Sequence, residues 1–373
     1  MSAGNSESTS LSHPLSGATV SLLVRLLRDN GPVPLKQWPR VGGVFLSALG
    51  RWPLTQVEKL ITSYRLNRVS GLPTPIFIIG HWRSGTTHLC NILSKSSQFG
   101  FVTPVAAGLP WELLTMGTYL QSFLEKQLPS SRLIDNVPVK PDSPQEDEFG
   151  IANMYPVSFL HALYFPGHFE RNLRRGVFFE GCTQKEIDHW KEMFRYYLTK
   201  VNLHQGKDKQ LLIRNPVYTS RIRMIREIYP DAKFIHIYRN PLRIYQSMKN
   251  YYRKLLPALS LQPYHEVDIE ETVLWVYARM MDRLEVESAE LPDEDYIEVR
   301  FENLESDPLG RIERIYDQLQ LQGFEDARGF FQRYLDSIKS YKKNVFEPDT
   351  AEMKRVKERW APYMERWEYL IDS

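Results

Sequence analysis

The sequence has few cysteines, no long hydrophobic run and almost no net charge. Its 373 residues include two cysteines, Cys90 and Cys182, which are too few for a disulfide framework or a multi-cysteine zinc site. No run of about 18 apolar residues occurs, so we expect no membrane-spanning helix. The 47 Lys and Arg residues nearly balance the 45 Asp and Glu residues, which gives no reason to expect a nucleic-acid partner. An anion-binding site must therefore be a local cluster of cations.

The N-terminal residues have no signal-peptide pattern, because no basic stretch is followed by an apolar one. Together with the low cysteine content, this favours a cytoplasmic protein. Residues 1–18 are polar and without periodicity, and we predict that they form a disordered tail.

Residues 19–74 are predicted to form an N-terminal helical extension, because their apolar residues recur with a helical period. One apolar stripe consists of Leu22, Leu23, Leu26 and Leu27, and a second of Val57, Leu60, Ile61 and Tyr64. Such stripes mostly face a core, so we expect these helices to cover the main domain or to pair with another subunit in a homo-oligomer. A role at a membrane surface is a further alternative.

Residues 75–373 are predicted to form the main domain, an α/β fold. Short apolar runs predict buried strands at 76–79, 99–102, 211–213, 234–238 and 296–300. Helical stretches lie between them at 86–93, 221–229, 241–255 and 270–287. Strands that alternate with helices predict a three-layer arrangement, in which helices cover both faces of a parallel sheet.

The first strand leads into the loop Gly80-His81-Trp82-Arg83-Ser84-Gly85-Thr86-Thr87, which precedes a helix. Free backbone N–H groups and the positive end of the helix dipole make such a loop an anion cradle. The two glycines have the spacing of a Walker A loop, but the position of its lysine holds Thr86. The cation is Arg83 instead, which argues against a Mg²⁺-dependent ATPase or GTPase.

Two further strands also end in cations. The run at 234–238 is followed by Arg239-Asn240-Pro241 and a helix that contains Ser247. The run at 211–213 is followed by Arg214-Asn215-Pro216. The carboxyl ends of parallel strands meet at one edge of a sheet, so we expect these cations near the loop, with Arg239 in a second cationic pocket at a neighbouring strand end.

These segments together resemble the sulfotransferases that use 3′-phosphoadenosine 5′-phosphosulfate (PAPS). The 5′-phosphosulfate loop of that family reads K/R-S/T-G-T/S-T, and residues 83–87 match it at all five positions. The family's 3′-phosphate segment reads R-D/N-P with a serine in the following helix. The resemblance spans about residues 75–365, and it implies a P-loop-like fold and transfer of a sulfonate group to an acceptor hydroxyl or amine. It also implies PAPS as co-substrate, PAP as product and no metal.

The resemblance assigns a role to each matching residue. The 5′-phosphosulfate would be held by Arg83, Ser84, Gly85, Thr86 and Thr87. The 3′-phosphate would be held by Arg239 and Ser247, and Lys342 or Lys343 would close over the nucleotide unless that loop is merely a solvated charged segment. Arg214 stands where several sulfotransferases have lysine, so it would stabilise developing charge but could not donate a proton.

In-line transfer also needs a base for the acceptor proton. Residues 142–149 resemble a mostly bacterial subgroup with a P-Q-E-D-E segment. Ser143, Pro144 and Glu146 fit a helical capping box, which gives Glu146 a structural task and makes Glu148 the favoured base, with Glu146 second. Helix-dipole complementation is the structural alternative for these acids, and His81, His161 and His168 are alternative bases.

Several questions stay open at this point. The aromatic residues between 155 and 169 line either a pocket for an apolar or aromatic acceptor or an ordinary core. The sequence does not distinguish between a glycan, a lipid-like alcohol, a phenol and a polyketide as the acceptor. Two other functions are alternatives, a P-loop kinase and a PAPS-binding protein without turnover.

Overall fold

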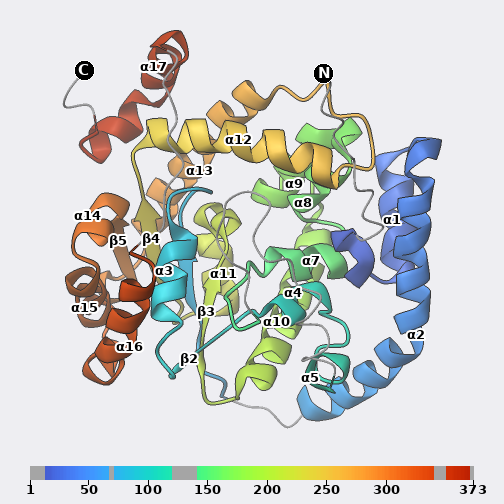
Figure 1. Cartoon of the computed structure of the whole chain (residues 1–373), viewed down its shortest axis with the longest axis horizontal. Helices are drawn as coiled ribbons and strands as arrows, with labels where there is room; N and C mark the ends of the chain where they lie inside the picture. The colour runs from blue at the N-terminus through green and yellow to red at the C-terminus, as the bar shows by residue number, and fades with distance from the viewer. Residues whose placement is uncertain (1–12, 67–70, 120–140, 340–349, 370–373) are drawn as a thin grey trace, which may run out of the picture.

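The computed structural model describes residues 13–66, 71–119, 141–339 and 350–369. A five-stranded parallel sheet lies at its centre, with the strand order β2-β3-β1-β4-β5 (Figure 1). The strands are β1 (Ile76–Ile79), β2 (Phe99–Phe101), β3 (Gln210–Arg214), β4 (Lys233–Tyr238) and β5 (Tyr296–Arg300). All five lie where apolar runs predict them, because strands of a covered parallel sheet are buried on both faces.

The two faces of the sheet enter two separate apolar clusters. On β1, Ile76 and Ile78 join one cluster while Phe77 and Ile79 join the other, as the two-residue period of a strand requires. The first cluster includes residues of α3 (Thr86–Leu93), α14 (Phe301–Ser306), α15 (Pro308–Gln318) and α16 (Phe324–Ser337). The second includes residues of α10 (Gln184–Gln205), α11 (Ile222–Ile228), α12 (Pro241–Leu259) and α13 (Ile269–Ser288). The three-layer prediction is confirmed.

The other helical segments lie outside these two sets. They are η1 (Pro14–Gly17), α1 (Val20–Asn30), η2 (Leu35–Gln37), α2 (Trp38–Leu66), α4 (Pro104–Gly108), α5 (Met116–Tyr119), α7 (Glu148–Met154), α8 (Leu160–Tyr164), η3 (Pro166–His168), α9 (Phe169–Phe178), η4 (Pro216–Ser220), η5 (Asp293–Asp295) and α17 (Thr350–Arg366).

The prediction of a disordered tail through residue 18 is wrong for residues 13–18. His13 caps η1 by accepting a hydrogen bond from the Leu15 backbone, and its other ring nitrogen lies 2.9 Å from the carbonyl oxygen of Leu259. Leu15 and Ala18 are buried in the main core. This short polar sequence is ordered because Leu15 and Ala18 pack into the main core and the imidazole of His13 lies within hydrogen-bond distance of Leu259.

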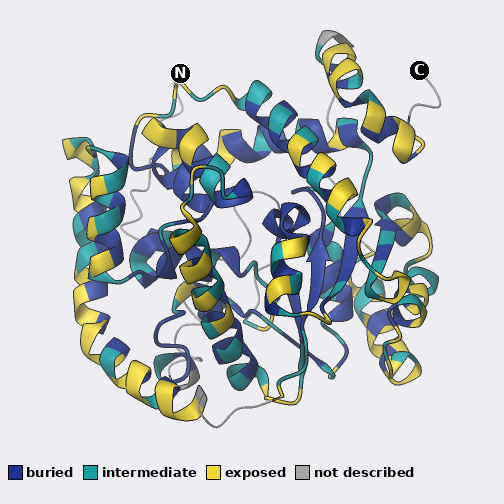
Figure 2. Cartoon of the chain, turned by 180° about the vertical axis from the view of Figure 1, so that it is seen from behind, coloured by how far each residue is buried: buried dark blue, intermediate teal, exposed yellow. Residues whose placement is uncertain are grey.

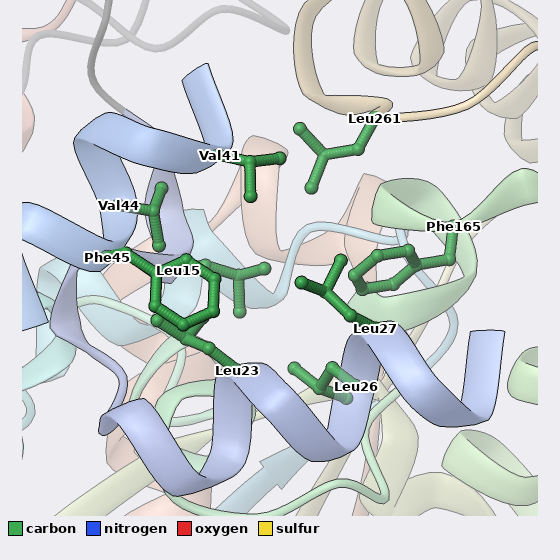
Figure 3. Close-up of a pocket in the computed structure, with 9 residues that line it drawn as sticks. All are labelled: Leu15, Leu23, Leu26, Leu27, Val41, Val44, Phe45, Phe165 and Leu261. Atoms are coloured by element: carbon green, nitrogen blue, oxygen red, sulfur yellow. The ribbon is translucent and has the colours of Figure 1, made fainter. Parts of the chain in front are cut away.

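The first apolar stripe of the N-terminal extension packs against the main domain. Figure 3 shows Leu23, Leu26 and Leu27 of α1 across a small crevice from α2. The crevice is lined only by apolar side chains, the others being Leu15, Val41, Val44, Phe45, Phe165 and Leu261. Phe165 and Leu261 belong to the main domain, so α1 and the first half of α2 share its core.

The second stripe does not face a core. Val57, Leu60 and Tyr64 are exposed on α2, which runs along one edge of the molecule in Figure 1 and carries exposed residues along its outer side in Figure 2. The prediction that these helices cover the main domain is therefore correct for the first stripe and wrong for the second.

Candidate functional site

The loop between β1 and α3 has a backbone conformation that requires glycine at two positions. Gly80, Arg83 and Gly85 have φ angles of 139°, 71° and 112°, all in the left-handed region. A Cβ atom at Gly80 would lie 2.2 Å from the carbonyl oxygen of Ile237, and one at Gly85 would lie 2.3 Å from the ring of Phe301. Glycine is therefore required at both positions by conformation and by space, and the loop wraps closely over the ends of β1 and β4.

The side chain of Arg83 joins the loop to the second cationic segment. Its Nε donates to the hydroxyl of Ser247 in α12 over 2.9 Å. Arg239, at the end of β4, lies near enough to feel the charges of Arg83 and Arg243. Burial, together with these two like charges, lowers the pKa of Arg239, while Glu302 and Glu305 act in the opposite direction. The structure thus brings the two predicted phosphate-binding segments to one cationic cluster.

Two residues of this cluster escaped the sequence analysis. Phe301, the first residue of α14, fills the space that Gly85 leaves open, and the guanidinium of Arg239 stacks 4.3 Å from the centre of its ring. Arg243 adds a third positive charge one helical turn beyond Arg239. The position of Phe301 directly after a strand is a usable signal, but a single aromatic residue there is too common to be read as part of a site.

Buried polar atoms at the loop fit an anionic ligand. The Ser84 hydroxyl and the Trp82 indole nitrogen are buried and have no hydrogen-bond partner among the described residues. An unsatisfied buried donor costs about 1–3 kcal/mol, so such donors mark places where a ligand or a water supplies the acceptor. Both flank Arg83, and sulfonate or phosphate oxygens are acceptors of the required kind.

Arg214 connects this loop to a carboxylate. One of its terminal nitrogens, Nη1, donates to Thr87 Oγ1 over 2.9 Å and to Glu146 Oε1 over 2.8 Å. The guanidinium is nearly buried at the end of β3, and its Nε has no partner among the described residues. Arg214 therefore lies between the predicted phosphosulfate loop and one of the two predicted bases.

The predicted helix start at Ser143 is wrong. The chain is non-helical from Ser143 to Glu146, and α7 begins at Glu148. The backbone N–H of Gln145 donates to the carbonyl oxygen of Val102, and the Glu146 carboxylate pairs with Arg214 rather than capping a helix. The structural task that had counted against Glu146 as a base therefore does not exist.

Glu148, the base that the sequence favours, lies in a different environment from Glu146. It is almost fully buried, and one carboxylate oxygen accepts from the Ser158 hydroxyl and the Phe159 backbone while the other accepts from Asn215. Burial raises the pKa of Glu148, an effect opposed first by the charge of Arg221. Both oxygens of this carboxylate therefore have hydrogen-bond partners within the protein, and almost none of its surface is exposed.

Asp147 between them is also buried and accepts a hydrogen bond from Tyr218. Burial raises its pKa to about 8. Glu146 differs from both neighbours because its side chain keeps 13% of its surface exposed. Of the three consecutive acids, Glu146 therefore has the most exposed side chain.

The three histidines proposed as alternative bases lie in environments that differ from that of Glu146. Burial lowers the pKa of His81 and of His161 to about 4, which makes them weak bases. The His161 ring lies between the carbonyl oxygens of Pro156 and Ala152, and the His81 ring packs against Tyr277. His168 is exposed in η3.

The aromatic run between 155 and 169 belongs to the core. Its rings are buried in the cluster on the α10 side of the sheet: Tyr155, Phe159, Tyr164, Phe165 and Phe169. Phe159 packs edge-on against Trp82 at 4.9 Å between ring centres, so this run supports the loop from behind. Lys342 and Lys343 lie outside the described residues.

The described part of the chain lacks two further features. Within it, no three His, Cys, Asp or Glu side chains gather in a way that could hold a metal ion. None of the described helices has the length and apolar character needed to cross a bilayer.

The chain thus combines a parallel sheet, whose first strand leads into a loop that carries Arg83, with a second arginine–serine segment that is hydrogen-bonded to this loop. This is the arrangement that the resemblance to sulfotransferases predicts. The comparisons agree. The model of the Sulfotransferase family matches residues 75–326, and the chain belongs to that family. Sulfotransferases use PAPS and a hydroxylated acceptor, so the predicted enzyme class and co-substrate are confirmed, whereas a P-loop kinase is not supported.

Two relatives in sequence and two in structure come from mycobacteria. The chain is 28% identical over 330 residues to the omega-hydroxy-beta-dihydromenaquinone-9 sulfotransferases Stf3 of Mycobacterium bovis and Mycobacterium tuberculosis, which covers 87% of this chain and 81% of theirs. The sulfotransferase STF9 of Mycobacterium avium superposes with a TM-score of 0.67 at 15% identity, covering 94% of this chain and 96% of that one. STF1 of Mycobacterium tuberculosis gives 0.61 at 16% identity, with 95% and 94% covered. These two structures support the fold.

Proposed function

We propose that this sulfotransferase moves the sulfonate of PAPS onto the hydroxyl of an apolar, lipid-like acceptor, with Glu146 as the general base. The observation that carries the donor half of this proposal is the 2.9 Å hydrogen bond between Arg83 and Ser247. It joins the segment assigned to the phosphosulfate to the segment assigned to the 3′-phosphate.

The donor half uses the loop and the arginine cluster. Backbone N–H groups at the start of α3 and the Ser84 hydroxyl donate to the 5′-phosphosulfate, with Arg83 as its cation; Gly85, Thr86 and Thr87 complete the cradle. Arg239 and Ser247 hold the 3′-phosphate. Lys342 and Lys343 remain candidates for closing over the nucleotide.

The acceptor half uses Glu146 and Arg214. Glu146 takes the proton of the acceptor hydroxyl while that oxygen forms its bond to sulfur. The bond from sulfur to the bridging oxygen of PAPS breaks in line, and PAP leaves with the electron pair. Arg214 holds the Glu146 carboxylate in place and lies against Thr87, where it stabilises the negative charge that develops on the transferring group.

The choice of acceptor rests on the relatives. The two that are 28% identical are named for a hydroxylated menaquinone, a lipid with a long apolar tail. We infer the same chemical class for this chain, a hydroxyl at the end of an apolar molecule. A homo-oligomer and a cytoplasmic location stay predictions from the sequence.

Two measurements test this function in order. Thermal unfolding with PAP or with ADP and Mg²⁺ should show a larger stabilisation by PAP, because Arg239 and Ser247 recognise the 3′-phosphate that ADP lacks. Transfer from ³⁵S-labelled PAPS to a panel of sugars, phenols, sterols and hydroxylated isoprenoid quinones then identifies the acceptor. A larger stabilisation by ADP and Mg²⁺, or PAP binding without transfer to any panel member, would contradict the proposal.

A further inference from the structure

The second half of α2 has its polar residues on the inside and its apolar residues on the outside. Residues at helical spacing, Arg51, Thr55, Glu58 and Thr62, are buried against the main domain. Leu46, Leu49, Trp52, Val57, Leu60 and Tyr64 point outward and form what we call the outer face of α2. Leu46 and Leu60 each expose 72% of their surface and Trp52 exposes 59%. This is the reverse of the usual arrangement of a surface helix.

Buried ion pairs fix this orientation. Arg51 bonds to the carboxylate of Glu112 at 2.7 Å, and Glu58 pairs with Lys200 at 2.8 Å. Glu58 also accepts from the backbone N–H of Leu114. Turning α2 to bury its leucines would strip these charges of their partners, which is far more costly than leaving apolar side chains in water. The outer face is therefore held outward by the fold.

An apolar surface of this extent requires an occupant. Monomers in water rarely expose a contiguous apolar patch larger than a few hundred Å². The outer face of α2 runs over five turns, from Leu46 to Tyr64, and Trp38 continues it at the start of the helix.

The charges around the outer face point to one kind of occupant. Lys36, Lys59 and Arg65 are exposed on or next to α2, whereas Glu58, the one acid between residues 35 and 66, is buried. By the helical period, Lys59 and Arg65 lie on opposite flanks of the apolar stripe, and the Lys59 ammonium lies 5.3 Å from the centre of the Trp111 ring beside α2. Exposed leucine with tryptophan and tyrosine, flanked by cations and free of exposed carboxylates, is the composition of a helix that lies in the interface of an anionic lipid bilayer.

A second copy of the chain fits this face less well. Two outer faces packed together would bring cations near cations with no exposed carboxylate from either helix to pair with them. Lipid headgroups supply the missing negative charge, and the acyl region accepts the apolar side chains.

We propose that the outer face of α2 docks the enzyme on the surface of an anionic membrane, with α2 lying parallel to the bilayer plane. This docking goes beyond the proposed transfer reaction and does not depend on the identity of the acceptor. It implies that the enzyme works at the boundary between water, where PAPS is dissolved, and lipid.

Vesicle co-sedimentation tests this proposal with the full chain. We expect the protein to sediment with vesicles of phosphatidylcholine and phosphatidylserine, and less with phosphatidylcholine alone. The triple variant Leu49→Gln, Trp52→Gln, Leu60→Gln should lose roughly tenfold or more of its vesicle binding. The matched control is Val286→Gln with Phe330→Gln, because these side chains are exposed to a similar degree elsewhere on the surface. It should bind vesicles as the unaltered protein does.

Two further readouts keep the outcomes distinct. Stabilisation by PAP should be the same in all variants, which shows that the fold and the donor site are intact, so that loss of vesicle binding and failure of the transfer proposal are separate results. The double variant Lys59→Glu, Arg65→Glu should bind less to the anionic vesicles only. Failure of the unaltered protein to bind anionic vesicles would overturn the proposal. So would light scattering that shows a dimer which the triple variant, but not the control, converts to monomer.

Discussion

The proposed donor side and the proposed acceptor side of the site are built in different ways. The donor side consists of two strand–loop–helix units, at residues 76–93 and 233–259, in which the binding groups follow directly from a strand end and a helix start. The acceptor side depends on Glu146, which lies in a non-helical segment and owes its position to an arginine 68 residues away. Local sequence determines the first, and tertiary contacts determine the second.

Three neighbouring acids show what this difference means. Glu146, Asp147 and Glu148 are chemically alike, yet one pairs with Arg214 at the loop and the other two are buried in hydrogen bonds behind it. The surroundings of each carboxylate, and not its chemistry, therefore distinguish the three residues. Mutations on the two sides of the site should differ accordingly in their effects on catalysis, nucleotide binding and stability.

The largest expected effect separates Glu146 from Glu148. Glu146→Gln should lower kcat by about 10²–10⁴-fold, because it removes the proton acceptor while leaving the donor site intact. Steady-state transfer from labelled PAPS measures kcat, and PAP-induced stabilisation should stay nearly unchanged.

The same substitution at Glu148 should affect stability and not kcat. Glu148→Gln is expected to lower the free energy of unfolding by about 1–3 kcal/mol, because the amide cannot accept all the bonds that the carboxylate accepts. The kcat of its folded fraction should be close to that of the unaltered enzyme. A larger loss of kcat in Glu148→Gln than in Glu146→Gln would reverse our assignment of the base.

The next effect concerns the specificity of the donor side. Arg239→Ala should weaken binding of PAP by about 10–100-fold, as expected for a lost charge-assisted hydrogen bond, and should change binding of AMP much less. Calorimetric titration with both nucleotides measures this. Arg223→Ala serves as control, because Arg223 is exposed and pairs with Glu290. Equal losses for PAP and AMP would place Arg239 at the 5′ end instead.

A change in stability, with no direct effect on the proposed ligand contacts, tests how tightly the loop is packed. Gly85→Ala should lower the free energy of unfolding by about 2–4 kcal/mol, because the added methyl group meets Phe301 at a positive φ. Gly42→Ala in α2 meets nothing within 4 Å and should raise it by about 0.5–1 kcal/mol. Urea unfolding of both variants makes the comparison, and a neutral Gly85→Ala would mean that the loop is looser than described.

The smallest effect is a pH dependence on the acceptor side. Burial raises the pKa of Asp147 from 3.8 to about 8, so the folded protein holds this proton where the unfolded chain has lost it. The resulting stabilisation is complete below about pH 4 and is lost as the pH rises through 8.

The interval from pH 6.5 to 8 is the useful one for this test. The lowered pKa values of His81 and His161 act below 6.5 and with the opposite sign. Between pH 6.5 and 8 the free energy of unfolding should fall by up to about 1.4 kcal/mol per pH unit from this group. Asp147→Asn should remove this contribution, and the slope that remains includes that of Glu148, whose pKa burial also raises. An unchanged slope in the variant would show that Asp147 is ionised in the folded protein.

The sequence predicted the sheet and the donor loop because both are encoded over short distances. The strands are apolar runs between turn residues, and Gly80, Arg83 and Gly85 adopt their conformations within one loop. The same reasoning failed at Ser143, since a Ser-Pro-x-Glu pattern is a good helix start in isolation but here Gln145 bonds to Val102. For α2 it left open which face is buried, because a helical period shows that two faces differ and does not show which one packs against the core.

The hydrogen bond between Arg83 and Ser247 has one more consequence. A free arginine side chain loses up to about 2 kcal/mol of rotamer entropy when it is immobilised. In this protein Arg83 is held between the loop and α12 by folding itself. The donor site is thus preorganised, and nucleotide binding retains the free energy that ordering a mobile arginine would otherwise consume.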